Sequence, residues 1–214
     1  LGNDANGGTD LTEVNLAATD QATDSPTNNW ATWNSISIGP TGYITFSEGN
    51  TALTATTQWR WGASTLAANK GKWYMEIKQG GTDGSERVYY GIGTVPYFAN
   101  VGAQTLEPGS APIARADVQI YASRESTGQM YTNSGTTSGT AASYLSSWDE
   151  DDIIGIQMDL DNQTMAVAVN NSWGADISII ADEYFQFCMF GYQNGTTLCN
   201  FGNPAYANSS DAAD

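Results

Sequence analysis

The sequence predicts an all-β protein, an antiparallel two-sheet β-sandwich with an extended N-terminal arm. Three observations predict this fold class. Residues 72–78 alternate apolar and polar side chains, which is the period of a strand with one buried face. Residues 153–160 and 164–169 are β-rich runs joined by the polar turn Asp161-Asn162, as in an antiparallel hairpin. No stretch has helical periodicity for more than a turn or two, and no internal repeat is present.

The chain length of 214 residues suits one sandwich with terminal extensions. Residues 1–34 are rich in Asn, Gly, Thr and Asp and poor in core residues, which is typical of an extended arm or linker. We expect the sandwich over residues 35–206. Residues 207–214 form a polar tail without a terminating element, so we expect this chain to be a piece of a longer polypeptide.

Turn signals and β-rich runs place the strands in order along the chain. Two long irregular segments, residues 96–115 and 126–147, interrupt the pattern. The expected strands are residues 43–46, 52–57, 72–78, 88–93, 118–121, 130–131, 153–160, 164–169, 177–180, 184–190 and 196–201.

Apolar residues within these strands are the expected core. They are Trp73, Met75, Ile77, Ile92, Ile154, Ile156, Met158, Leu160, Val167, Val169, Phe187, Met189, Leu198 and Phe201. Both sides of the strand at 153–160 carry apolar residues, so the alternation leaves open which parity faces inward. We expect Cys188 and Cys199 to be buried and unpaired, although a disulfide is geometrically feasible if their strands pair.

Charge and composition exclude several classes of partner and mechanism. The chain has 23 acidic and 7 basic side chains, a net charge of −16, and no His. A surface this acidic repels phosphate backbones and anionic lipids, so we expect no nucleic-acid binding and no membrane insertion. Neutral glycans, proteins or cations such as Ca²⁺ fit it better. The absence of His excludes a histidine base and the commonest zinc sites.

Four motifs carry a resemblance to a known family. They are Gly71-Lys72-Trp73-Tyr74-Met75-Glu76-Ile77, Tyr90-Gly91-Ile92-Gly93, Asp152-Ile153-Ile154-Gly155-Ile156-Gln157-Met158-Asp159-Leu160-Asp161 and Asn200-Phe201-Gly202. Their order and spacing over about residues 41–204 resemble the SPRY domain, a concanavalin-like jelly-roll sandwich. The chain departs from the family at Asp151, where Gly is usual, and at Asn170-Asn171, where Asn-Gly is frequent. The motifs are core and turn residues, so the resemblance implies a fold and leaves function open.

The flanking residues are similar to a linker in large tailed-phage virion proteins, where it joins a laminin-G-like lectin sandwich to a SPRY-like one. The similarity lies in residues 1–4 and 20–33, and in the Ser/Gly/Thr-rich loop before Ser143-Tyr144. It implies a structural protein of the virion surface, either a tail-fibre segment or a capsid appendage. The expected partners are other virion proteins, copies of the same chain and host-surface glycans.

We expect no enzymatic activity. The sequence has no serine nucleophile elbow and no phosphate-binding loop. Two alternatives to the virion interpretation remain. One is a carbohydrate-binding module of a secreted bacterial protein. The other is a carboxylate-based glycoside hydrolase or lyase, for which the acidic chain offers candidates but no specific pair.

Binding residues are expected on loops at the ends of the sandwich, because strand residues are committed to the core. Tyr97 and Phe98 lie in the first long segment, and Tyr131 and Tyr144 in the second. Aromatic rings of this kind stack on the C–H faces of sugars. The alternative is that these rings pin the loops to the body of the domain.

The acidic turn that contains Asp149, Asp151 and Asp152 is the candidate metal site. Carboxylate oxygens are ligands for Ca²⁺, although the spacing does not match a helix–loop–helix calcium site. The alternative is a solvated turn that precedes a strand. We expect no other cofactor.

Overall fold

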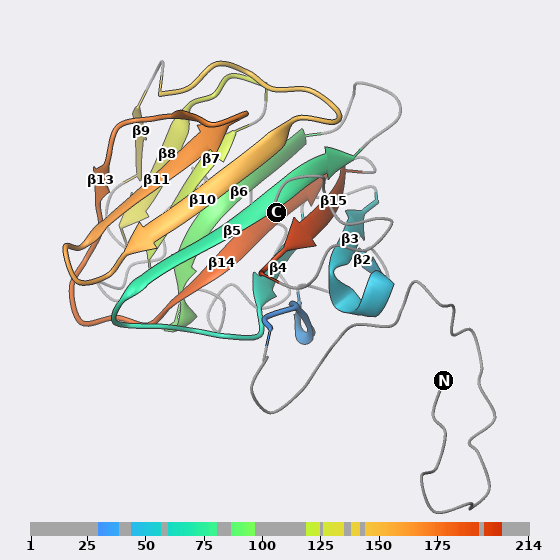
Figure 1. Cartoon of the computed structure of the whole chain (residues 1–214), viewed down its shortest axis with the longest axis horizontal. Helices are drawn as coiled ribbons and strands as arrows, with labels where there is room; N and C mark the ends of the chain where they lie inside the picture. The colour runs from blue at the N-terminus through green and yellow to red at the C-terminus, as the bar shows by residue number, and fades with distance from the viewer. Residues whose placement is uncertain are drawn as a thin grey trace, which may run out of the picture.

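The computed structural model describes residues 30–38, 44–56, 60–80, 87–96, 119–124, 126–134, 138–141, 144–192 and 195–202. In this part of the chain fifteen strands form two antiparallel sheets that lie one in front of the other (Figure 1). A short 3-10 turn, η2 (Glu48–Asn50), lies between two of the strands. The predicted fold class, an all-β antiparallel sandwich, is confirmed. None of the helical turns in the described ranges has the length or apolar character to span a membrane.

The first sheet has the strand order β1-β4-β14-β6-β7-β8-β9. All its neighbouring strands pair antiparallel. β14 comes late in the chain but pairs with both β4 and β6, so the sheet joins segments far apart in sequence. The strands are β1 (Trp33–Ile38), β4 (Arg60–Ser64), β14 (Phe185–Tyr192), β6 (Arg87–Thr94), β7 (Gln119–Arg124), β8 (Met130–Ser134) and β9 (Ser138–Ala141).

The second sheet has the strand order β12-β11-β10-β5-β15-β3-β2, and β13 also pairs with β11. The predicted hairpin at its centre is confirmed, with Met158 opposite Met165 and Asp159 opposite Thr164. The strands are β12 (Ser172–Trp173), β11 (Thr164–Val169), β10 (Ile153–Asp159), β5 (Lys72–Gly80), β15 (Gly195–Asn200), β3 (Ala52–Ala55), β2 (Ile44–Ser47) and β13 (Ile177–Ser178).

The core lies between the two sheets. The second sheet contributes the even-numbered residues of β10, so the parity that the sequence left open is settled: Ile154, Ile156 and Met158 face inward. β5 contributes Met75 and Ile77, which pair with Ile156 and Ile154. The first sheet contributes, among others, Tyr90, Ile92, Phe185, Phe187 and Met189.

Two of the predicted core residues are not in the core. Trp73 has the inward parity of β5, but it lies near the start of the strand and 46% of it is exposed. There it lines a small pocket of about 100 Å³ with Phe187 and Phe201. Leu198 is only partly buried, because it pairs with Lys78 on the outward parity, while Cys199 pairs with Ile77 and is buried instead.

The two cysteines are free and buried, as predicted. They lie on different sheets, Cys188 on β14 and Cys199 on β15. Burial raises the pKa of both thiols well above the ordinary value. Both are therefore neutral small apolar groups in this fold.

The first strand begins at Trp33, which is fully buried in the core. The predicted boundary between arm and sandwich, at residue 34, falls inside this strand. Residues 1–29 of the predicted arm and the predicted tail, residues 207–214, lie outside the described residues.

Candidate functional site

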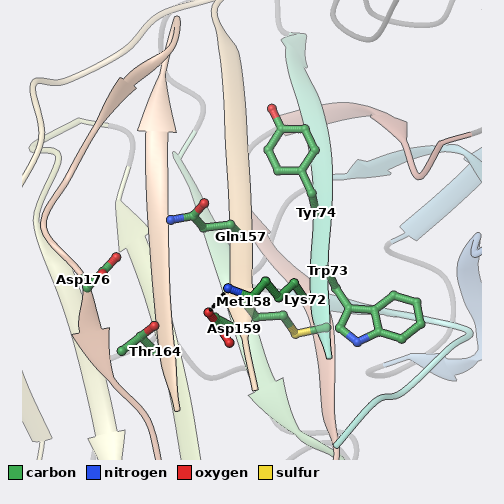
Figure 2. Close-up of a pocket in the computed structure, with 8 residues that line it drawn as sticks. All are labelled: Lys72, Trp73, Tyr74, Gln157, Met158, Asp159, Thr164 and Asp176. Atoms are coloured by element: carbon green, nitrogen blue, oxygen red, sulfur yellow. Dashed lines mark ion pairs between the residues drawn. The ribbon is translucent and has the colours of Figure 1, made fainter. Parts of the chain in front are cut away.

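An open groove lies on the outer face of the second sheet, across β5, β10 and β11 (Figure 2). Its volume is about 400 Å³, which is in the range of ligand-binding clefts. We call it the sheet-face groove. It is lined by Lys72, Trp73, Tyr74, Gln157, Met158, Asp159, Thr164 and Asp176. Trp73 and Met158 border it from positions of inward parity, and the ring of Trp73 points away from the other side chains.

Strand register sets the order of side chains in the groove. Successive side chains on a strand point to opposite faces, so the neighbours of the buried residues point outward. Tyr74 lies opposite Gln157, and Lys72 lies opposite Asp159, which in turn lies opposite Thr164. Each of these rows joins β5 to β10, two strands that are distant in sequence. The groove therefore exists only because β5 pairs with β10.

Two exposed aromatic side chains lie side by side on this face. Tyr74 on β5 is 48% exposed and Trp173 on β12 is 41% exposed. Their ring centroids are 6.1 Å apart, and the ring planes are inclined by 49°. Gly155 of β10 lies beneath both rings, since a Cβ there would lie 3.1 Å from Tyr74 Oη and 3.4 Å from Trp173 Cη2. We call these two side chains the aromatic pair.

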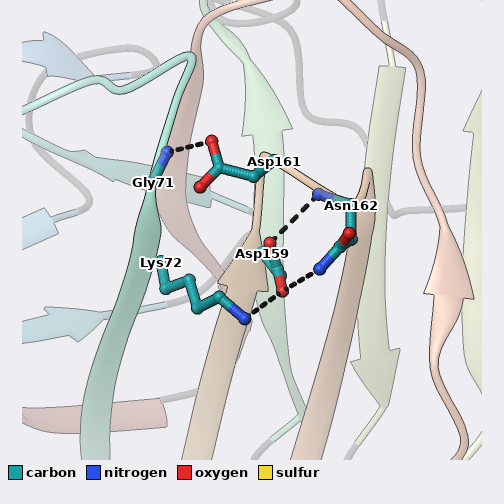
Figure 3. Close-up of polar contacts among 5 residues, drawn as sticks. All are labelled: Gly71, Lys72, Asp159, Asp161 and Asn162. Atoms are coloured by element: carbon teal, nitrogen blue, oxygen red, sulfur yellow. Dashed lines mark hydrogen bonds and ion pairs between the residues drawn. The ribbon is translucent and has the colours of Figure 1, made fainter.

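An ion pair forms the other end of the groove. Lys72 Nζ lies 2.8 Å from Asp159 Oδ2. Asp159 also accepts hydrogen bonds from Asn162, at 2.8 Å from the side-chain amide and 3.1 Å from the backbone amide (Figure 3). The bond with Lys72 is the largest of several effects that lower the pKa of Asp159 to about 2 and raise the pKa of Lys72. The carboxylate is therefore ionised at every physiological pH.

The turn between β10 and β11, which contains Asn162, is tied to the start of β5 by a second carboxylate. Asp161 accepts a hydrogen bond of 2.9 Å from the backbone amide of Gly71 (Figure 3). At the other end of the groove, Tyr74 donates its phenolic hydrogen to Glu76. Burial, followed by this hydrogen bond, raises the pKa of Tyr74, so the phenol stays protonated. Both ends of the groove are thus held by bonds within the sheet.

The structure describes two of the four predicted binding residues. Tyr131 packs edge-on against Tyr89 at 5.2 Å, and its hydroxyl donates to Gln129 at 3.0 Å. The hydroxyl of Tyr144 accepts a hydrogen bond of 3.1 Å from the backbone amide of Val167. Neither lines the sheet-face groove. Tyr97 and Phe98 lie outside the described residues.

The candidate metal residues bond to protein groups. Asp152 accepts from the backbone amide of Asp149 at 2.8 Å and from the side chain of Asn170 at 2.7 Å. Asp151 forms an ion pair of 3.0 Å with Lys78. Within the described ranges, no group of three or more Asp, Glu, His or Cys side chains is arranged to hold a metal ion. The structure holds Asp149, Asp151 and Asp152 in one turn but does not bring their carboxylates together around a point.

Sequence reasoning missed the aromatic pair because it assigned strand residues to the core. Tyr74 has the same parity as the polar residues Lys72, Glu76 and Lys78, and it alternates with the buried residues of β5. This position indicates an outward-facing ring. Trp173 follows the Asn170-Asn171 turn, where a short edge strand begins. The available signal was therefore parity within β5, but the meeting of the two rings could not be read from it.

Comparison with known proteins shows the fold. No family model matches the sequence, and no curated protein does. The crystal structure of the SPRY domain of human HERC1 is similar with a TM-score of 0.59 and 14% identity, covering 79% of this chain and 98% of that chain. The TRIM65 PSpry domain is similar with a TM-score of 0.54 and 9% identity, covering 80% and 92%. The chain therefore has a SPRY-like β-sandwich fold.

Proposed function

We propose that this chain is a non-enzymatic attachment domain of a phage virion appendage, which contacts the host surface through the sheet-face groove. The observation that carries the proposal is the aromatic pair, Tyr74 and Trp173, exposed beside a polar groove. Adjacent large rings in water are unfavourable unless something covers them, and they mark binding sites more often than scattered apolar residues do. The virion setting is supported by the resemblance of the flanking residues to phage linkers.

The electrostatics of the groove favour binding over hydrolysis. A glycoside hydrolase needs a carboxylic acid with a raised pKa beside a second carboxylate. Asp159 has the opposite shift, because Lys72 and Asn162 stabilise its ionised form. Its oxygens already accept bonds from both residues, so it has no proton to donate.

Adsorption of the isolated, fluorescently labelled chain to cells of the bacterium on which the phage grows tests the proposal. We expect saturable binding that Tyr74→Ala combined with Trp173→Ala abolishes. Tyr184→Ala is the matched control, since Tyr184 is 53% exposed and does not line the groove. Equal adsorption of the double variant and the wild type, at equal melting temperatures, would contradict the proposed role of the groove.

A second candidate function is a carbohydrate-binding module of a secreted bacterial protein. The same aromatic pair favours it, and it requires no virion. The mass of the intact native polypeptide and its sedimentation separate the two functions. A chain several times longer that sediments with phage particles supports the virion role, whereas a secreted chain linked to an enzyme supports the module.

A further inference from the structure

We propose that the sheet-face groove binds a neutral saccharide, with a sugar C–H face against Tyr74 and Trp173 and its hydroxyl groups toward Gln157, Thr164 and Asp159. This inference rests on the proposed attachment function and specifies the chemical class of the ligand at the same site. Four features of the groove support it: the arrangement of the rings, the unused polar groups, the charge and the length.

The two rings form a preorganised apolar surface. They are tilted at 49° with centroids 6.1 Å apart, so neither ring covers the face of the other as in a stacked pair. The hydroxyl of Tyr74 is fixed by Glu76. The backbone of Trp173 is held opposite Ala168 in the β11–β12 pairing, and its ring lies over Gly155. Rings fixed in this way lose little entropy on binding, and their faces suit the C–H groups of a pyranose.

Two polar side chains that face the groove are unused within the described chain, and a third has an acceptor position left over. The side chains of Gln157 and Thr164 make no hydrogen bond among the described residues, although Gln157 is exposed and Thr164 is half-buried. Asp159 has about four acceptor positions, and three are filled, one by Lys72 and two by Asn162. An amide, a hydroxyl and an ionised carboxylate offer both donors and acceptors to sugar hydroxyls.

The charge of the groove selects against anionic sugars. Glu76, Asp159 and Asp176 lie in or beside it, and Lys72, the one cation among the described residues that line it, is paired with Asp159. The chain carries a net charge of −16 as well. Phosphate, sulfate and carboxylate groups on a ligand would therefore be repelled. A neutral ligand loses nothing to this repulsion.

The length of the groove suits more than one sugar ring. Gly155, beneath the aromatic pair, and Asp159, at the ion pair, are four residues apart on β10. This separation corresponds to about 13 Å along a strand. Two linked pyranose rings fit this distance, with one ring on the aromatic pair and the other beside Asp159.

Isothermal titration calorimetry with cellohexaose, maltohexaose and chitohexaose tests the proposal, with polygalacturonate oligomers and heparin as the anionic comparison. We expect saturable binding of at least one neutral hexasaccharide and none of the anionic sugars. Trp173→Ala and Tyr74→Ala are expected to weaken that binding at least tenfold. Tyr184→Ala is expected to leave it unchanged. If an aromatic variant fails to fold, Gln157→Ala is expected to weaken binding in a chain of normal melting temperature.

The outcomes separate this inference from the proposed function. Binding of only anionic sugars, no binding of any neutral hexasaccharide at millimolar concentration, or binding unaffected by these variants would overturn the saccharide assignment. If the aromatic variants then still lose cell adsorption, the attachment function stands with a ligand of another class, such as a peptide. Neutral saccharide binding that requires Trp173, with cell adsorption that does not, would support the ligand and contradict the attachment function.

Discussion

Asn170 and Asn171 form the two-residue turn between β11 and β12, and both have φ in the left-handed region, at +47° and +64°. Asn tolerates this region better than most residues, and Gly tolerates it best. The two positions differ in what their side chains do. Asn170 accepts from the backbone amide of Ile153 at 3.0 Å and donates to Asp152 at 2.7 Å. The side chain of Asn171 makes no such bond within the described chain. The free-energy cost of having Asn at position 171 therefore comes from its backbone conformation alone.

Asn171→Gly is therefore expected to stabilise the protein. The gain in the free energy of unfolding is expected to be up to about 1 kcal/mol, because Gly relieves the left-handed strain. Asn170→Gly is the matched control and is expected to lower stability, since it removes the bonds to Ile153 and Asp152. Urea unfolding of the wild type and the two variants measures these differences in the free energy of unfolding. A destabilised Asn171→Gly variant would show that the turn depends on the second side chain.

Tyr144 illustrates a ring that fastens a loop to the sheet. Its hydroxyl satisfies the Val167 amide, and a Cβ at Gly174 would lie only 2.4 Å from its ring. Tyr144→Phe is expected to lower the free energy of unfolding by about 1 kcal/mol or more, because it leaves a part-buried amide without its acceptor. Tyr184→Phe serves as an exposed control. Lost cell or glycan binding at unchanged stability would instead make Tyr144 a ligand contact.

At the scale of elements, Asp159 fastens the β10–β11 turn to β5. Its carboxylate accepts bonds from Lys72 of β5 and from Asn162 of the turn (Figure 3). The pKa of Asp159 falls from its ordinary value of 3.8 to about 2. A carboxyl group whose pKa is lowered by folding stabilises the folded state. The whole of this stabilisation is present at a pH above the pKa of the group in the unfolded chain. That contribution is lost as the pH falls through the folded pKa. The turn should therefore weaken between about pH 4 and about pH 2.

Comparison of the wild type with Asp159→Asn over this range tests the contribution. The wild type is expected to be the more stable protein at pH 7, and the difference between the two is expected to shrink below about pH 4. Denaturant unfolding at pH 7, 4 and 2.5 measures it. Glu150→Gln, a change at an exposed carboxylate outside this turn, controls for the general effect of acid. A difference that stays constant with pH would mean that Asp159 acts through packing and not through its charge.

At the scale of the whole molecule, a net charge of −16 makes self-repulsion a general cost of folding. Salt reduces the screening length from about 30 Å at 0.01 M to about 3 Å at 1 M. We expect the melting temperature to rise with NaCl by several degrees. MgCl₂ and CaCl₂ at equal ionic strength are expected to act alike. A larger effect of CaCl₂ that Asp152→Asn removes would reveal a specific calcium site in the acidic turn.

Local patterns in the sequence predicted the class of fold and most of the strands, but not β1, β4, β9 or β12. Alternation in β5 and the Asp161-Asn162 turn between β10 and β11 are local properties, because side-chain period and turn chemistry depend only on neighbouring residues. The same local signals placed Met75, Ile77 and the β10 residues among the core candidates. The antiparallel sandwich followed from these patterns, its SPRY-like form was implied by the resemblance of the four motifs, and both are observed.

The role of each strand face depends on how the two sheets assemble. Trp73 shares the parity of the core, but the sheet ends beside it and leaves it exposed, and Cys199 takes the core position predicted for Leu198. The sheet-face groove needs β5 beside β10, a pairing between segments about eighty residues apart in sequence. Register between such strands is set by how the two sheets bury their apolar faces together. No local pattern contains that information, so Tyr74 and Trp173 became a candidate site only once the sheet was assembled.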